Sequence, residues 1–188
     1  MNVTRHLPIA HRPLCASAVD INTMHKTTQL FYLMLPAFIA NMAPPFVKYW
    51  PGWNSPISER WLGSHKTVIG FSAGILTAIA TTFVQSWIGW SGALIPYVDW
   101  PLLGAAIGFG AMSGDAVKSL IKRRLGIAPG VSWIPADQLD YVMGALACLW
   151  FWIHLDWQDV LLLFAVSFVG HIIVNHLAYY LGIRDTRW

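Results

Sequence analysis

Five long apolar stretches constrain the fold of this sequence more than any other feature. A helix that crosses a bilayer needs about 20 mostly apolar residues. Only 11% of the 188 residues are charged, which is too few to cover the surface of a soluble domain of this size. The sequence therefore predicts an all-α integral membrane protein with five transmembrane helices, at about residues 28–47, 67–88, 101–120, 138–155 and 159–181.

Basic residues are distributed unequally among the connections between these stretches. Residues 48–66 contain three Lys or Arg residues, residues 118–135 contain four, and the C-terminal tail contains two, whereas the other two connections contain none. Cytoplasmic loops of membrane proteins carry an excess of Lys and Arg. The pattern predicts two polar loops and the C-terminus in the cytoplasm, and the N-terminus on the opposite side of the membrane.

Residues 1–27 differ in composition from the rest of the chain. They contain Pro and polar residues and lack the apolar core of a secretory signal, so we expect a poorly ordered tail before a membrane domain over residues 28–188. Their basic residues conflict with an outer location. A second interpretation is that translation starts at Met24.

The segment around Asp115 combines an acid with a group of cations. If the third helix continues through it, Asp115, Lys118 and Lys122 share one face, and Ser119 lies one turn from Asp115. An acid at the end of a membrane span is costly and indicates function. A carboxylate beside cations suits a site for a metal ion and phosphate groups. The alternative is a basic topology anchor in which Asp115 only pairs with Lys118.

A second pair of acids follows the basic loop. Pro135 and Asp137 indicate the start of a helix, and Asp137 and Asp140 project from its first turn. Two carboxylates that close repel each other unless a cation lies between them or one is protonated. A divalent cation is the natural solution, and Asp115 could be a further ligand. The alternative is capping, with Asp137 as N-cap and Asp140 stabilised by the helix dipole.

The segment before the second stretch could bind an anion. Gly63 and Ser64 predict a turn, and Lys66 and Thr67 open a helix whose N-terminus would expose backbone N–H groups. The spacing is not that of a P-loop, and a plain turn is the alternative. The chain also lacks a G-x-S-x-G nucleophile motif and the basic–aromatic pattern of a nucleic-acid binder, so no nucleic-acid partner is expected.

Three motifs in order resemble the signature of the CDP-archaeol synthase family. GDAVKSLIKRRLGIAPG followed by PADQLD is similar to the family pattern G-D-x-x-x-S-x-x-K-R-R-L-G-x-x-x-G with a later D-Q-L-D, and LGSHKTVIGF is similar to L-G-x-x-K-T-x-x-G. With IANMAPPF and HIIVNHLAYYLGIRDTRW, the resemblance covers about Leu30 to Trp188. SHKTVIG departs from the family's usual form of that loop.

The resemblance implies a membrane cytidylyltransferase that transfers CMP from CTP to a lipid phosphate. The products would be a CDP-lipid and pyrophosphate, with Mg²⁺ as cofactor. An archaeal-type ether lipid phosphate is the implied acceptor, while a diacyl or polyprenyl phosphate and the oligomeric state stay open. The competing hypothesis is a non-catalytic small membrane transport or assembly protein, which would have no use for the cytoplasmic acids.

The resemblance also implies a role for each matching polar residue. The metal ligands would be Asp115, Asp137 and Asp140. The catalytic residues would be Asp115, Lys118 and Asp140. The residues that bind the triphosphate, the lipid phosphate or other parts of the substrates would be Asn41, Lys66, Thr67, Ser119, Lys122, Arg123 and Arg124.

Overall fold

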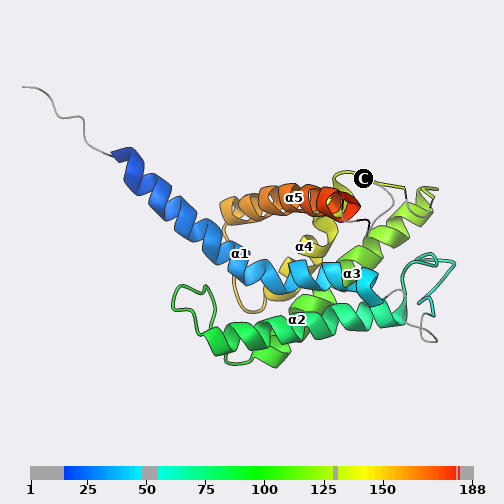
Figure 1. Cartoon of the computed structure of the whole chain (residues 1–188), viewed down its shortest axis with the longest axis horizontal. Coiled ribbons are helices and arrows are strands. Elements are labelled where there is room, and N and C mark those ends of the chain that lie inside the picture. The colour runs from blue at the N-terminus through cyan, green and yellow to red at the C-terminus, as the bar shows by residue number, and fades with distance from the viewer. Residues whose placement is uncertain (1–14, 48–54, 129–130, 181, 183–188) are drawn as a thin grey trace, which may run out of the picture.

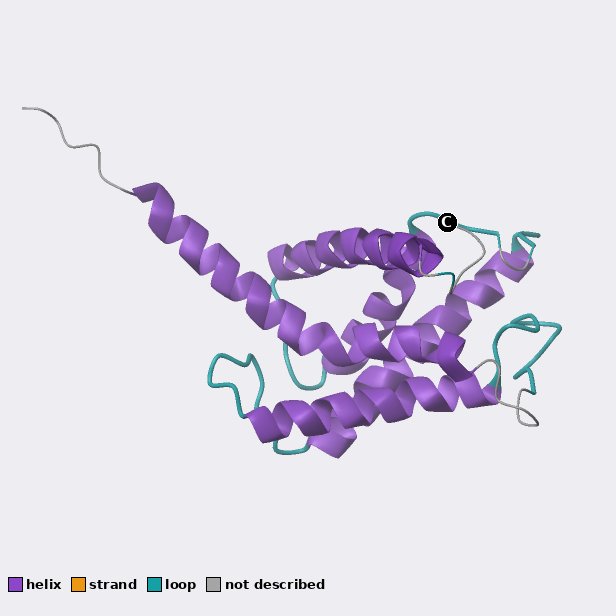
Figure 2. Ribbon diagram, in the orientation of Figure 1, coloured by secondary structure: helices purple, strands orange, loops and turns teal. Residues whose placement is uncertain are grey.

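The computed structural model describes residues 15–47, 55–128, 131–180 and 182, and this part of the chain is all-helical (Figures 1 and 2). Its five helices are α1 (Cys15–Val47), α2 (Val68–Ile88), α3 (Trp100–Arg124), α4 (Ala136–Leu149) and α5 (Trp157–Tyr180). An isolated bridge between Pro56 and Thr67 is the only β-type pairing in the described residues. The predicted all-α class is confirmed.

Three of the described helices are long and apolar enough to cross a membrane, over Met24–Val47, Val68–Ile88 and Trp157–Leu177. Helix α3 is long enough but carries charged residues in its second half. Helix α4 has 14 residues, about 21 Å at the usual helical rise, which is less than the roughly 30 Å of hydrocarbon in a bilayer. Length and composition alone therefore identify three spans.

Helix α1 begins earlier than the sequence predicts. The expected start was near residue 28, but the helix extends back to Cys15, so residues 15–27 of the expected tail are helical. In Figure 1 this first part of α1 projects away from the other helices. Residues 1–14, which belong to the same expected tail, lie outside the described residues.

Helix α3 packs between α2 and α4, and glycines allow close approach on both sides. Facing α2, a Cβ at Gly108 would lie 2.8 Å from the Cα of Ile75. Facing α4, Cβ atoms at Gly110 and Gly114 would overlap the backbone of Gly144 and the carbonyl oxygen of Asp140. Small residues let helix backbones touch in membrane proteins. The contact places the second half of α3 directly beside the first turn of α4.

The connections alternate between the two ends of the helical assembly (Figure 1). Residues 55–67 and the segment between α3 and α4 lie at one end, together with the charged end of α3. The α2–α3 and α4–α5 connections lie at the other end. The two basic connections therefore share one end, as the sequence predicts.

We predict that Gly144→Ala destabilises the protein by about 1–3 kcal/mol, because the new methyl group would overlap the backbone of α3 at Gly110. Thermal unfolding in detergent measures the effect. Gly170→Ala is the matched control, since a Cβ at Gly170 in α5 meets no atom within 4 Å. Alanine favours a helix by up to about 1 kcal/mol over glycine, so the control should be neutral or stabilising. Equal effects of the two variants would contradict the tight α3–α4 contact.

Candidate active site

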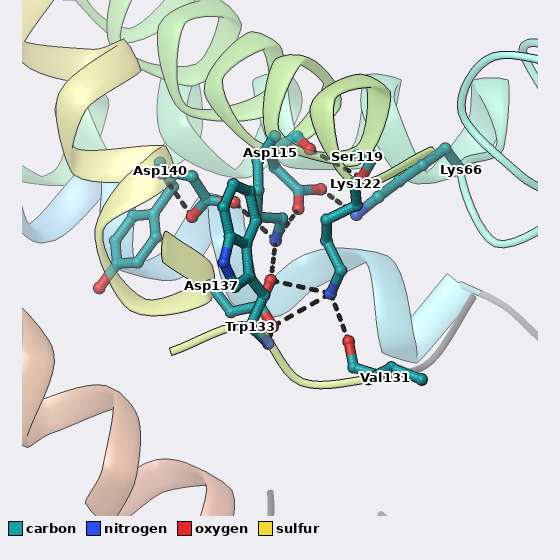
Figure 3. Close-up of polar contacts among 10 residues, drawn as sticks. Lys66, Asp115, Ser119, Lys122, Val131, Trp133, Asp137 and Asp140 are labelled. Atoms are coloured by element: carbon teal, nitrogen blue, oxygen red, sulfur yellow. Dashed lines mark hydrogen bonds and ion pairs between the residues drawn. The ribbon is translucent and has the colours of Figure 1, made fainter. Parts of the chain in front are cut away.

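Helix α3 continues unbroken to Arg124, so it presents Asp115, Lys118 and Lys122 on one face, as the spacing predicts. That face meets the first turn of α4, which carries Asp137 and Asp140. Figure 3 shows the three carboxylates turned toward the same region between the two helices. The fold thereby brings Asp115 close to Asp137 and Asp140, which lie 22 and 25 positions later in the sequence.

The ammonium group of Lys118 lies at the centre of these acids. Its Nζ is 3.0 Å from Asp115 Oδ1, 3.0 Å from Asp137 Oδ1 and 2.7 Å from Asp140 Oδ2. The side chains of Lys118 and Asp140 are only 14% and 5% exposed. Buried carboxylates this close require a compensating positive charge. The sequence favours a divalent cation between the acids, whereas in this structure the ammonium group of Lys118 lies there.

Two further lysines pair with the outer side of the cluster. Lys66 Nζ pairs with Asp115 Oδ2. Lys122 Nζ lies 3.2 Å from both oxygens of Asp137 and donates a hydrogen bond to the carbonyl of Val131. The three carboxylates are thus matched by three ammonium groups. We call these six residues the acid–lysine cluster: Lys66, Asp115, Lys118, Lys122, Asp137 and Asp140.

A short antiparallel pairing positions Lys66. The N–H of Ile57 donates to the carbonyl of Lys66 at 2.8 Å, and the N–H of Val68 donates to the carbonyl of Ser55 at 3.1 Å. These bonds hold the segment before α2 against the incoming chain, so that the Lys66 side chain reaches Asp115 on α3. The sequence includes this lysine among the site residues but does not predict the pairing that directs it.

Thr67 has a structural contact of its own. It is the N-cap of α2, and its Oγ1 accepts a hydrogen bond from the N–H of Gly70 at 3.1 Å. The preceding turn forms as predicted, with Gly63 at φ 84°, a conformation that favours glycine. The Thr67 hydroxyl oxygen therefore already accepts a hydrogen bond that stabilises the first turn of α2.

Asp137 does not cap α4, contrary to the capping alternative. Helix α4 begins at Ala136 with Pro135 as N-cap, and Asp137 Oδ2 instead accepts a hydrogen bond from the N–H of Trp133 at 2.6 Å. Burial would raise the pKa of Asp137, but the hydrogen bond from Trp133 and the charges of the neighbouring lysines outweigh it and hold that pKa below its ordinary value. Asp137 therefore carries a negative charge at neutral pH.

The remaining predicted residues lie around the cluster rather than in it. The Ser119 hydroxyl donates to the backbone carbonyl of Asp115 at 2.9 Å. Arg123 donates to the carbonyl of Ile127, and the exposed Arg124 lies 6.0 Å from the centre of the Trp61 ring. Asn41 is half-buried near the end of α1. Their predicted contacts with substrates stay predictions.

Gln138 is a polar residue that the sequence reasoning did not select. It is 3% exposed, and its Oε1 has no hydrogen-bond partner among the described residues. An unpaired buried amide oxygen is costly unless a ligand or water satisfies it. Its position between the two acids of the DQLD motif is the sequence signal that points to it.

The donor chemistry of the cluster fits a magnesium ion. Carboxylate oxygens are the protein ligands that Mg²⁺ prefers. Three of them converge on one point, although that point is held by Lys118 Nζ. Among the described residues no group of three or more His, Cys, Asp or Glu side chains already has a metal-binding arrangement. A metal ion would therefore bind these acids only after Lys118 has moved.

The fold and the cluster define a class of protein: a helical integral membrane protein with a charged, partly buried site at one end. The family described as CarS-like CDP-archaeol synthase matches residues 23–188. The chain belongs to this CDP-archaeol synthase family.

Individual relatives agree with this assignment. A CDP-archaeol synthase of Sulfurisphaera tokodaii is 36% identical over 168 residues, which is 85% of this chain and 93% of the relative. A CDP-archaeol synthase of Methanoculleus marisnigri is 27% identical over 82% of this chain and the whole of the relative. A solved structure, described as an intramembrane enzyme for archaeal membrane lipids biosynthesis, covers 77% of this chain with a TM-score of 0.66 and 28% identity.

The predicted family and the predicted activity are therefore confirmed. The protein is a membrane enzyme that transfers a cytidylyl group from CTP to a lipid phosphate. The competing hypothesis of a non-catalytic transport or assembly protein finds no support in the comparisons.

We predict that Thr67→Ala lowers the stability of the protein by about 1 kcal/mol, because the first turn of α2 loses its cap. Thermal unfolding in detergent measures it. Thr67→Ser retains a hydroxyl and should keep most of the stability. Unchanged stability with a higher KM for CTP in Thr67→Ala would instead assign the hydroxyl to substrate binding.

Proposed function

We propose that the acid–lysine cluster is the active site at which CTP and the lipid phosphate react. The observation that carries this proposal is that three carboxylates from α3 and α4 converge on Lys118, with Lys66 and Lys122 paired at the edge of the same partly buried cluster. Both substrates are anionic, so the site must neutralise their charge and align them. The names of the relatives favour an archaeal ether-lipid phosphate as the acceptor.

In the reaction, an oxygen of the lipid phosphate forms a bond to the α-phosphorus of CTP. The bond from that phosphorus to the bridging oxygen of the β-phosphate breaks, and pyrophosphate leaves. The ammonium groups of Lys66, Lys118 and Lys122 can exchange carboxylate partners for phosphate oxygens and so stabilise the negative charge. Arg123 and Arg124 extend this positive region along the end of α3. No covalent intermediate with the protein is required.

Magnesium is the proposed cofactor, and Asp115, Asp137 and Asp140 would hold it. Their oxygens already face a common cation, which supports this assignment. When bound, the metal ion would neutralise phosphate charge and help to align the reacting groups. Ser119 and Asn41 are proposed as polar residues of the surrounding cavity.

We further propose that residues 28–188 form one membrane domain whose five helices all cross the bilayer, with the active site and the C-terminus at the cytoplasmic side. The basic connections support this orientation, because both lie at the end that carries the cluster. Helix α4 is short, so the exposed residues 150–152 that follow it, which include two tryptophans, would complete the crossing at the opposite interface.

Conversion of an acid of the cluster to its amide tests the proposed site. We expect Asp115→Asn and Asp140→Asn each to lower CTP-dependent pyrophosphate release at least about 100-fold, because charge stabilisation of phosphoryl transfer is lost. Release is measured with purified protein, labelled CTP and a panel of lipid phosphates.

Asp159→Asn is the matched control for these two variants. Asp159 is also an ion-paired acid, 3.0 Å from Lys26, but it lies at the start of α5, at the opposite end of the helices. It should retain activity, and all three variants should insert into the membrane. Full activity in both Asp115→Asn and Asp140→Asn would remove the cluster from the active site.

Membrane orientation is testable with single cysteines at two exposed serines. In a background with Cys15 and Cys148 replaced by Ser, we expect an impermeant maleimide added to intact cells to label Ser91→Cys and not Ser64→Cys. Ser64→Cys should react only after permeabilisation, because it lies in the basic connection next to the cluster. The reverse labelling pattern would invert the proposed topology.

A further inference from the structure

Lys118 occupies the point at which the acids would hold a metal ion. The carboxylate oxygens turned toward its Nζ belong to all three proposed metal ligands, at 2.7 to 3.0 Å. Lys66 and Lys122 differ, because each contacts a single carboxylate at the edge of the cluster. A metal ion and the Lys118 ammonium group could not share the centre, since two cations in a poorly solvated space repel each other.

The charges of the cluster are already balanced. Three carboxylates face three ammonium groups, so a divalent cation that entered alone would leave an excess of positive charge in a site that is largely shielded from water. A nucleotide triphosphate brings several negative charges and offers new partners for the lysines. Charge balance therefore favours joint entry of the metal ion and the nucleotide.

The geometry points to Lys118 as a built-in occupant of the metal position. We propose that Lys118 excludes free divalent cations from the three acids while no nucleotide is bound, and that its ammonium group moves to a phosphate oxygen when metal and nucleotide enter together. The flexible four-carbon stem of lysine permits such a movement without a change in the backbone of α3. This inference rests on the proposed function, because it takes the three acids as the metal ligands.

Binding of Mn²⁺ to the purified full-length protein tests the inference without turnover. Equilibrium dialysis in detergent reports the metal ions that the protein retains. The experiment is run once with CTP on both sides of the membrane at equal concentration and once without CTP, and lipid phosphate is left out of both. For the unmodified protein we expect affinity for Mn²⁺ to be at least about tenfold higher with CTP than without it, a coupling that must be reciprocal. This measurement needs no variant and is independent of any folding defect.

Variants at position 118 should remove this dependence. Lys118→Met should bind Mn²⁺ without CTP at least about tenfold more tightly than the unmodified protein, because the competing charge is gone. Lys118→Arg, which keeps the charge, should bind as weakly as the unmodified protein. Lys122→Met is the matched control, since it also removes one lysine of the cluster but leaves the centre occupied. Its effect should be much smaller.

The possible results separate the two proposals. Two results would show that Lys118 does not exclude the metal ion: equal binding of Mn²⁺ by the unmodified protein with and without CTP, or equal binding by Lys118→Met and the unmodified protein. Either result would leave the proposed metal site in place. If Asp115→Asn binds Mn²⁺ with CTP as well as the unmodified protein does, the acids are not the metal ligands, and the proposed metal site fails together with the inference.

Discussion

The backbone contact between α3 and α4 is the constraint on which the site depends. Three carboxylates can reach one ammonium group only if the two helices that carry them almost touch. Gly110 and Gly114 on α3 and Gly144 on α4 permit this, because a Cβ at any of them would overlap the partner helix. Gly114 lies against the carbonyl of Asp140 and directly precedes Asp115 in the sequence. The close packing of α3 against α4 is therefore what brings the acids of the site together.

Such a site is stable only as a set of opposite charges. Each carboxylate is shielded from water on the side that faces the helices, and removal of one partner would leave an uncompensated charge in a medium of low dielectric constant. The lysines that balance the acids come from two separate segments, α3 and the residues before α2. Their ion pairs therefore tie the segment before α2 and the start of α4 to α3. A phosphate ligand can replace carboxylates as partner of these lysines without a loss of charge balance, which makes the cluster suited to bind and release anions.

Much of this arrangement could be predicted from the sequence, and the rest depends on distances between helices. Spacing alone places Asp115, Lys118 and Lys122 on one face, and the proximity of Asp137 to Asp140 predicts either a cation between them or protonation of one of them. Whether Lys118 reaches the acids depends on how closely α3 approaches α4, and the local sequence does not predict the distance between the two helices. The same applies to the hydrogen bond from Trp133 to Asp137, which is formed in place of the alternative helix cap, and to the burial of Gln138. The sequence does not predict that α1 starts at Cys15, because residues 15–27 are too polar for a membrane span.

As the proposed active site, the cluster would lie at a position along the helices where a water-soluble nucleotide and a lipid phosphate can meet. A lipid phosphate lies at the boundary between hydrocarbon and water, and its tails cannot follow it into an aqueous cleft. The charged half of α3 and the first turn of α4 lie next to the polar connections, whereas α1, α2 and α5 carry exposed large apolar side chains and are long and apolar enough to cross a membrane. In the proposed site, both anionic substrates would be bound mainly through charge, which fits the lysines and arginines at that end.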